Sequence, residues 1–184
     1  MRIVAGTRRG AKLEAPPGHT VRPTADRVRE ALFNILDGGR YGIPYRGKLV
    51  VDAFAGTGGL GLEALSRGAR HAVFLEQAIP SRTVLFQNIR ALRYEEVTTV
   101  IDGDATAMRR PASEVASLIL LDPPYNSNLA TPCLEALKLH GWVAKETIVV
   151  LELAAKEAPH LPDWLALLDE RRYGAARLVF AGMT

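Results

Sequence analysis

From Gly47 onward, short apolar runs alternate with segments of helical pattern, and this alternation restricts the chain to few folds. The apolar runs have almost no polar interruptions, which is typical of strands buried on both faces of a parallel sheet. Helices between them supply the crossovers that parallel pairing requires. The pattern therefore predicts a doubly wound α/β domain. Strands are expected at 49–54, 71–76, 97–102, 115–121 and 147–153, with one helix ending near Leu65 and another at 80–93.

The two ends of the chain follow other patterns. Residues 165–173 and 175–180 flank Gly174 too closely for an intervening helix, so they should pair antiparallel. Near the start, 2–5 and 11–15 flank a glycine-bounded turn and predict a hairpin with a basic tip. Thr24 is a candidate N-cap for a helix that a Gly-Gly pair at 38–39 would end. We therefore divide the chain into an N-terminal basic extension, 1–46, and a main domain, 47–184.

The composition is that of one globular domain that needs no disulfide bond or structural metal ion. The chain has 184 residues, of which 48% are apolar and 23% charged, and this is ordinary for a single soluble domain. A chain of this length buries enough surface to fold unaided. Its single cysteine, Cys133, excludes an internal disulfide and a multi-cysteine zinc site. No apolar run approaches the ~18 residues of a membrane span and no signal segment is visible, so we expect a cytoplasmic protein.

The formal net charge of +3 is distributed unevenly. Residues 1–46 hold nine Lys or Arg and four Asp or Glu, a net +5, whereas the remainder has a net charge of −2. Such asymmetry is typical of a chain whose basic part contacts an anionic partner. A solvated, arginine-rich surface would give the same distribution, so the charge alone leaves both interpretations open.

A glycine-rich loop marks the junction between the first expected strand and its helix. Gly56, Gly58 and Gly61 satisfy G-x-G-x-x-G, and Glu76 ends the next expected strand about twenty residues later. Glycines let the backbone approach a ligand, the helix N-terminus offers amide donors, and the carboxylate can accept hydrogen bonds from a ribose. A tight strand–helix turn without a ligand is the simpler alternative. The combination favours a nucleotide-like ligand, either NAD or S-adenosylmethionine.

Three features favour S-adenosylmethionine over NAD. The chain contains a single mononucleotide-binding half and no second catalytic domain. Asp52, just before the glycine turn, would repel a pyrophosphate but could pair with the ammonium group of a methionine moiety. Asp104, after the third expected strand, could accept a hydrogen bond from an adenine amino group. Capping of a helix N-terminus is the alternative role for Asp104.

The residues Asp122-Pro123-Pro124-Tyr125 follow the fourth expected strand, at the sheet edge where open α/β folds bind ligands. The two prolines stiffen the backbone, and the carboxylate with a nearby carbonyl can accept hydrogen bonds from a flat amino group. Tyr125 offers a ring on which a base can stack. An amine held this way presents its lone pair to an electrophilic methyl group, with Asp122 stabilising the developing positive charge. A strand stopped by prolines and a capping Asp is the structural alternative.

Together with a third segment, these motifs resemble one family. The segment 22–34, Arg-Pro-Thr-Ala-Asp-Arg-Val-Arg-Glu-Ala-Leu-Phe-Asn, and the loop 52–69 are similar to the RsmD family of 16S ribosomal RNA guanine-N2 methyltransferases. The resemblance runs from Arg2 to Phe180. It implies a Rossmann-like class I S-adenosylmethionine-dependent methyltransferase fold, mostly parallel, whose last strand is antiparallel. It also implies methyl transfer to the exocyclic N2 of a guanine in 16S rRNA, within an assembled or assembling small subunit.

Carried over to this chain, the family motifs imply a catalytic loop and a cofactor pocket. The catalytic loop would be Asp122, Pro123, Pro124 and Tyr125. The residues implied for the cofactor are Arg22, Thr24, Asp52, Phe54, Gly56, Gly58, Glu76, Asp104 and Ala105. Two positions depart from the family pattern: 77–80 lack the charged residues expected after the ribose acid, and Ala53 stands where a bulkier apolar residue is usual.

The resemblance also gives the basic extension a partner. Arg8 and Arg9 at the expected hairpin tip are the first candidates for phosphate contacts, followed by Lys12 and Arg27. Arg27 and Arg29 could instead pair with acids of their own helix. The four histidines are scattered and no metal site is indicated. We expect a monomer that works without a metal ion or a membrane.

Two other functions remain open on the sequence. An amino-methyltransferase acting on DNA adenine or on a protein glutamine would share the chemistry of residues 122–125, although a large target-recognition domain is missing. A non-catalytic RNA-binding or ribosome-assembly factor, with the cofactor pocket kept for structural reasons, is the alternative from another class.

Overall fold

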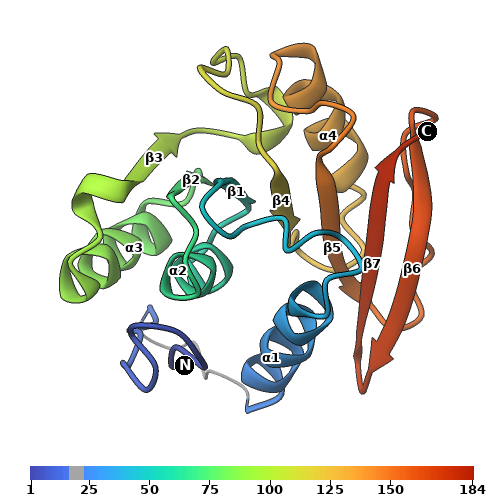
Figure 1. The fold of residues 1–184 in the computed structure, drawn as a ribbon. Helices are drawn as coiled ribbons and strands as arrows, with labels where there is room; N and C mark the ends of the chain where they lie inside the picture. The colour runs from blue at the N-terminus through green and yellow to red at the C-terminus, as the bar shows by residue number, and fades with distance from the viewer. Residues whose placement is uncertain (17–22) are drawn as a thin grey trace.

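The computed structural model describes residues 1–16 and 23–184 and confirms the predicted alternation of strands and helices (Figure 1). The strands are β1 (Leu49–Ala53), β2 (His71–Glu76), β3 (Thr98–Asp102), β4 (Leu118–Leu121), β5 (Ile148–Ala154), β6 (Leu165–Tyr173) and β7 (Ala176–Met183). The helices are α1 (Pro23–Asp37), α2 (Gly59–Ser66), α3 (Ile79–Leu92) and α4 (Ala130–Leu139), with the 3₁₀ turns η1 (Glu95–Val97) and η2 (Ala105–Ala107). Within the described ranges, no helix is long and apolar enough to span a membrane.

The strands form a seven-stranded sheet in the order β3-β2-β1-β4-β5-β7-β6. The first five in this order pair in parallel. β7 lies antiparallel between β5 and β6, because the short turn at Gly174 leaves no length for a crossover helix. The predicted Rossmann-like architecture with an antiparallel last strand is therefore confirmed. The order of the strands reverses between β1 and β4, and open α/β sheets form their ligand crevice at such a switch point.

Successive side chains of each strand point to opposite faces of the sheet, so a hydrophobic core lies on each face. Val50, Leu120 and Phe180 point to the face covered by α1, where Leu32 and Leu36 are buried against them. α2 and α3 cover the adjoining part of the same face. The opposite face packs against α4, which Figure 1 shows across the sheet from the other three helices. Although α1 belongs to the first 46 residues, it is thus part of the core that supports the sheet.

Residues 1–14, which we name the N-terminal strap, fold back on themselves and lie against α2 and α3. Arg2 and Lys12 form an antiparallel bridge, and the Ile3 amide donates to the Ala11 carbonyl at 2.9 Å. The predicted hairpin is therefore present, but its arms meet in a single bridge rather than in two full strands. Ile3 and Leu13 are buried in the core beneath α2 and α3, so apolar contact holds the strap to the body of the protein.

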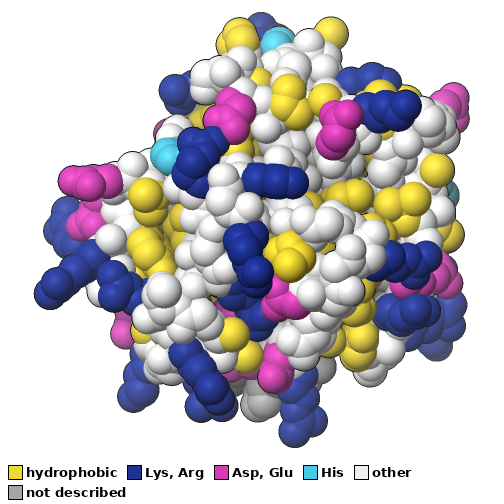
Figure 2. Space-filling model, viewed as in Figure 1, with side chains coloured by type: hydrophobic (Ala, Val, Ile, Leu, Met, Phe, Trp, Pro, Cys, Tyr) yellow, Lys and Arg dark blue, Asp and Glu magenta, His cyan; other side chains and the backbone are white. Residues whose placement is uncertain are grey.

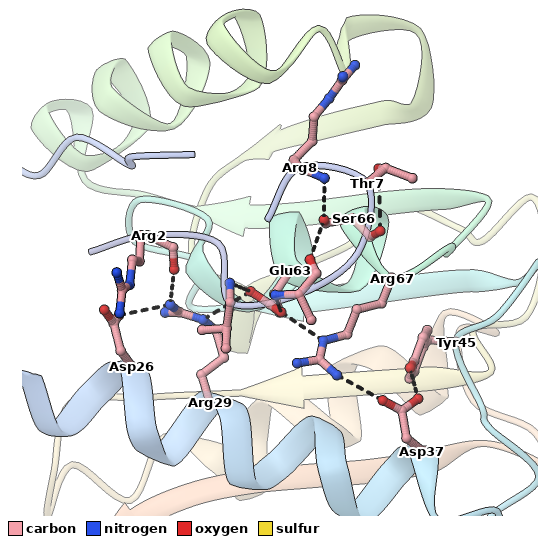
Figure 3. A network of polar contacts seen from close by, with 12 residues as sticks. Arg2, Thr7, Arg8, Asp26, Arg29, Asp37, Tyr45, Glu63, Ser66 and Arg67 are labelled. Carbon is pink, nitrogen blue, oxygen red and sulfur yellow. Dashed lines mark hydrogen bonds and ion pairs between the residues drawn. The ribbon is translucent and has the colours of Figure 1, made fainter. Parts of the chain in front are cut away.

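A buried carboxylate in α2 adds a polar attachment for the strap (Figure 3). Glu63 is 0% exposed, and its oxygens accept hydrogen bonds from the amides of Val4 at 2.8 Å and Ala5 at 3.0 Å. Arg67 Nε donates to the same carboxylate at 2.7 Å, and Arg29 Nε lies 3.5 Å from it. A buried charge is costly unless it is paired and hydrogen-bonded. These contacts therefore tie the strap, α1 and α2 together.

The same network reaches both ends of α1. Arg29 is buried, and its Nη2 donates to Asp26 Oδ1 at 2.9 Å and to the Arg2 carbonyl. The helix pairing that competed with an RNA contact for Arg29 is therefore confirmed. At the other end of α1, Arg67 Nη1 donates to Asp37 Oδ2 at 2.8 Å. Figure 3 shows these groups as one continuous set of contacts between α1, α2 and the strap.

A few element ends differ from those predicted. β1 stops at Ala53 because Phe54 has a φ of 64°, a left-handed conformation that ends the strand. β4 begins at Leu118, later than predicted, because residue 116 bonds to the loop before β5. α1 begins at Pro23, so Thr24 lies inside its first turn rather than ahead of it. The side chain of Thr24 lies outside the described residues.

The close approach of the strap to α2 depends on Gly6. A Cβ atom at Gly6 would lie 1.8 Å from the Ser66 carbonyl oxygen, whereas Gly10 has a similar φ (+84° against +81°) and open space around it. We expect Gly6→Ala to lower the free energy of unfolding by about 3 kcal/mol and Gly10→Ala by only about 1 kcal/mol, the cost of the left-handed backbone alone. Chemical denaturation and hydrogen exchange of the strap amides measure both. Equal losses in the two variants would contradict this packing account.

Candidate active site

A cavity of about 720 Å³ opens at the carboxyl edge of the sheet, where β1, β2, β4 and β5 end. Met1, Ala15 and Pro16 bring the N-terminal segment into its wall. Of the residues that the sequence proposes for cofactor and target, the cavity is lined by Asp52, Phe54, Gly56, Glu76, Ala105, Asp122, Pro123, Pro124 and Tyr125. The glycine loop and the Asp-Pro-Pro-Tyr loop therefore face one common space.

The glycine loop turns sharply between β1 and α2. Phe54 and Gly56 both have positive φ values, 64° and 55°, and both line the cavity. Gly58 has a different role, because a Cβ there would lie 2.5 Å from Leu85 Cδ1. It lets α2 and α3 pack closely and is not among the cavity-lining residues. The first residue of α2, Gly59, lines the cavity, so the positive end of the helix dipole faces the enclosed space.

Glu76, at the end of β2, is held by the backbone on both sides. Its Oε2 accepts a hydrogen bond from the Gly56 amide at 2.7 Å, and its Oε1 accepts one from the Ala78 amide at 2.7 Å. Each carboxylate oxygen has a second lone pair, so the side chain can still accept hydrogen bonds from a ligand. The glycine loop thus orients the acid that the sequence assigns to a ribose.

Asp52 is an acid held inside the protein at the end of β1. It is 1% exposed, and its Oδ2 accepts a hydrogen bond from the Gly61 amide at 2.7 Å. Burial raises the pKa of Asp52 to about 8, the Gly61 hydrogen bond opposes this, and the charge of Glu76 adds to it. None of the ion pairs among the described residues includes Asp52. A buried acid of this kind suits a ligand that brings its own positive charge.

After β3, adjacent residues have different surroundings. Gly103 and Ala105 line the cavity. Asp104 is exposed and caps η2, accepting hydrogen bonds from the Thr106 amide and hydroxyl, both at 2.8 Å. Its carboxylate therefore performs the N-cap role that was the alternative, and contact with an adenine stays a prediction for this residue.

The target loop places an aromatic ring and an acid at the other side of the cavity. Tyr125 is 44% exposed, and its hydroxyl donates to Glu152 Oε1 at 3.2 Å. Asp122 is accessible from the cavity but surrounded by protein on its other sides. This surrounding protein raises the pKa of Asp122 well above its ordinary value, and the charges of Glu152 and Asp52 raise it further. Asp122 thus favours a bound proton more than an ordinary aspartate does.

The sequence did not point to two charged residues that line this cavity, Arg29 and Glu152. Burial raises the pKa of Glu152, while the Tyr125 hydrogen bond and the charge of Arg29 lower it. Glu152 had a detectable signal, because it is the one charged residue of the otherwise apolar strand β5. Arg29 had none, because an arginine beside Asp26 on a helix is equally typical of a surface ion pair.

The candidate RNA contacts lie away from the cavity floor. Arg8, Arg9, Lys12 and Arg27 are all exposed. Arg8 has a structural role as well, because its Nε donates to the Leu92 carbonyl at 3.0 Å at the end of α3.

Two residues predicted to bind the cofactor cannot be placed. Arg22 lies outside the described residues, and so does the side chain of Thr24. Within the described part of the chain, no three His, Cys, Asp or Glu side chains form a group that could hold a metal ion.

The sheet is mostly parallel and Rossmann-like, with an antiparallel last strand. Its glycine loop is hydrogen-bonded to the acid that ends β2, and Asp-Pro-Pro-Tyr follows β4 on the other side of the same cavity. This fold and this site define a class I S-adenosylmethionine-dependent methyltransferase. Residues 1–182 match the model of the family described as conserved hypothetical protein 95. The chain belongs to this family, the RsmD family that its motifs resemble.

Named relatives and a solved structure agree with this assignment. The chain is 34% identical over 180 residues to ribosomal RNA small subunit methyltransferase D of Escherichia coli strain K12, across 95% of this chain and 85% of that protein. The protein of the same description from Haemophilus influenzae is 32% identical over 178 residues, across 95% and 89%. The solved structure of the Escherichia coli protein yhhF has a TM-score of 0.82 and 31% identity, across 100% of this chain and 97% of that one.

The raised pKa of Asp52 makes the stability of the protein depend on pH. Between the ordinary value of 3.8 and the folded value of about 8, the folded protein retains a proton that the unfolded chain has lost. Stability therefore falls as the pH rises through this window, and the loss is complete above pH 8. Asparagine is neutral throughout and can still accept the Gly61 hydrogen bond. We expect Asp52→Asn to raise the melting temperature more at pH 8.5 than at pH 5, by roughly 4–8 °C, or about 2 kcal/mol.

Thermal unfolding of the ligand-free protein at the two pH values measures this difference. Glu76→Gln, in the same cavity but on an acid that the backbone holds in place, is the matched control for removal of one carboxylate. A gain of the same size at both pH values for Asp52→Asn would contradict the assignment.

Proposed function

We propose that the protein transfers a methyl group from S-adenosylmethionine to the exocyclic N2 of a guanine in 16S ribosomal RNA. The observation that carries this proposal is the meeting of the glycine loop, Glu76 and the loop 122–125 in one cavity. Relatives described as ribosomal RNA small subunit methyltransferase D support the same class of substrate. When bound, S-adenosylmethionine supplies an electrophilic methyl group on a positively charged sulfur.

The glycine-loop side of the cavity fits this cofactor. Glu76 keeps lone pairs for the ribose hydroxyls while the backbone fixes its orientation. Asp52 pairs with the ammonium group of the methionine moiety, which compensates the cost of its burial. Arg29 meets the methionine carboxylate near the N-terminus of α2. Gly103 and Ala105, which line the cavity with little or no side chain, would leave room for the adenine ring.

The other side of the cavity holds the target base. Tyr125 stacks on the base after the nucleotide has left its helix. Asp122 accepts hydrogen bonds from the amino group and directs the nitrogen lone pair toward the methyl group. With the cofactor bound, a new N–C bond would form as the bond from the methyl carbon to sulfur breaks, and the sulfur would retain that electron pair. Because its pKa is raised, Asp122 is suited to accept the proton that the nitrogen then loses.

In this proposal, the strap and the end of α3 contact the RNA phosphates. Arg9 and Lys12 project from the strap, and Arg90 and Arg93 are exposed at the end of α3, where Arg8 joins the two. In Figure 2 Lys and Arg side chains lie along the lower left of the molecule, over these two segments, and further groups lie at its right side and top. Such a surface neutralises phosphate charge without reading sequence.

The setting in which the protein works follows from its size. Most of the cavity wall serves the cofactor and the reacting amine, so little surface is left for reading base sequence. We therefore infer that the protein recognises the shape of an assembled or assembling small subunit. Action as a single copy, in the cytoplasm and without a metal ion, is part of the same proposal.

Substitution of Asp122 separates chemistry from cofactor binding. We expect Asp122→Ala to lower kcat at least 100-fold, because the amine loses the group that aligns it and stabilises its charge, while the dissociation constant for S-adenosylmethionine changes by less than about threefold. Labelled methyl incorporation into unmethylated small subunits and calorimetry measure the two quantities. Equal loss of cofactor binding would assign Asp122 to the cofactor instead. Absence of incorporation by the unchanged protein would favour a non-catalytic assembly factor.

Charge reversal on the strap tests the RNA surface. We expect the double variant Arg9→Glu and Lys12→Glu to weaken RNA binding at least tenfold at low salt and to flatten its salt dependence, with cofactor affinity unchanged. Arg8 is left in place because it supports the strap. Lys48→Glu with Lys145→Glu makes the same charge change with two exposed lysines in the segments that precede β1 and β5, outside the strap and α3. If this control weakens RNA binding equally, the strap is not the contact surface.

A further inference from the structure

Glu152 lies where the sheet brings a second carboxylate beside Asp122. In the parallel pairing of β4 with β5, Leu121 is opposite Leu151. The next residues along the two strands, Asp122 and Glu152, therefore come side by side at the carboxyl edge. Neighbouring strands are about 4.8 Å apart, and both side chains line the cavity. The two acids can thus face one flat ligand edge together.

A carboxylate at this position destabilises the folded protein, so its presence points to a functional role. The rest of β5 is apolar, burial raises the pKa of Glu152, and its charge destabilises the charged form of Asp122. Its hydrogen bond to the Tyr125 hydroxyl uses one lone pair of one oxygen. The remaining acceptor capacity faces the cavity beside the ring on which the target base stacks.

The Watson–Crick edges of the bases differ in what they can offer to two neighbouring carboxylates. Guanine presents two adjacent donors, N1–H and the N2 amino group. Adenine and cytosine present one amino group beside a ring-nitrogen acceptor, and uracil presents one N–H between two carbonyl oxygens. A ring-nitrogen acceptor opposite a carboxylate is repelled, and a buried mismatch of this kind is strongly discriminating. A pair of acids therefore selects guanine.

We propose that Glu152 determines base specificity by accepting a hydrogen bond from N1–H of the target guanine while Asp122 accepts from its N2 amino group. This assignment rests on the proposed function and adds to it the group that distinguishes guanine from the other bases. The Tyr125 hydroxyl donates to one oxygen of the Glu152 carboxylate, and the charge of Arg29 favours the ionised, accepting form of this carboxylate.

The test replaces the target guanine by 2-aminopurine, which keeps the 2-amino group but has an acceptor at N1. Unmethylated small subunits carry either base at the position that the unchanged protein labels, and kcat/KM is measured for each. We expect the unchanged protein to prefer guanine at least 30-fold. Glu152→Gln, whose amide can donate to N1 of 2-aminopurine, should lower the rate on guanine and reduce this preference at least tenfold. The comparison between variants cancels the different intrinsic reactivity of the two amines.

Control variants separate recognition from a structural role. Tyr125→Phe removes the hydroxyl but leaves the carboxylate, so its preference for guanine should persist whatever its rate. Glu157→Gln changes an acid just after β5 that instead bonds to the Asn126 and Ala154 amides and does not line the cavity, and it should keep the preference too. Glu152→Ala should lose the preference without gaining activity on 2-aminopurine. Cofactor affinity and melting temperature confirm that each variant is folded.

The outcomes distinguish the two levels of the proposal. If the unchanged protein does not label guanine N2, the proposed function fails. If it does, but Glu152→Gln retains the full preference for guanine, or loses it only to the extent that Tyr125→Phe does, the role of Glu152 is overturned and the proposed function stands.

Discussion

The site depends on one constraint: parallel strands end at the same edge of a sheet, so acids at their carboxyl ends are forced together. Asp52, Glu76, Asp122 and Glu152 follow or end four neighbouring strands and line one cavity. Burial raises the pKa values of Asp52, Asp122 and Glu152, and the charges of neighbouring acids add to the shift for Asp52 and Asp122. Such an arrangement is unfavourable for the empty protein and complementary to a cationic ligand beside a donor-rich base edge, which is the pair of reactants that the proposed reaction requires.

The N-terminal segment is a structural part of this site as well as its basic surface. Glu63 fixes the strap through the amides of Val4 and Ala5, and Arg29 joins the strap to α1 while lining the cavity. Met1 lies in the cavity wall. Binding of RNA phosphates by the strap would therefore act on the same segment that helps to enclose the cofactor. The positive charge of residues 1–46 is in this way divided between structural arginines such as Arg29 and exposed ones.

The sequence predicted those parts of the site whose signals are local. Glu76 and the loop 122–125 each directly follow an apolar strand pattern, so their place at the sheet edge could be inferred. The roles of Gly58 and Asp104 could not be separated from ligand binding without the packing of α3 and the capping of η2. Glu152 had a local signal as the one charged residue of β5, but its position beside Asp122 depends on the register of β4 with β5, which no local pattern encodes. The order of the strands in the sheet was not predicted, whereas the antiparallel pairing of the last two strands followed from their short connection.

In the proposed function, one cavity brings the methyl donor and a guanine of 16S rRNA together. The most direct measurement incubates the protein with labelled S-adenosylmethionine and, separately, unmethylated small subunits, naked ribosomal RNA and DNA, and then identifies and maps the labelled nucleoside. The account predicts N2-methylguanosine at one position of the small-subunit RNA, with assembled subunits labelled more efficiently than naked RNA. Label on adenine, in DNA or in ribosomal protein would contradict it.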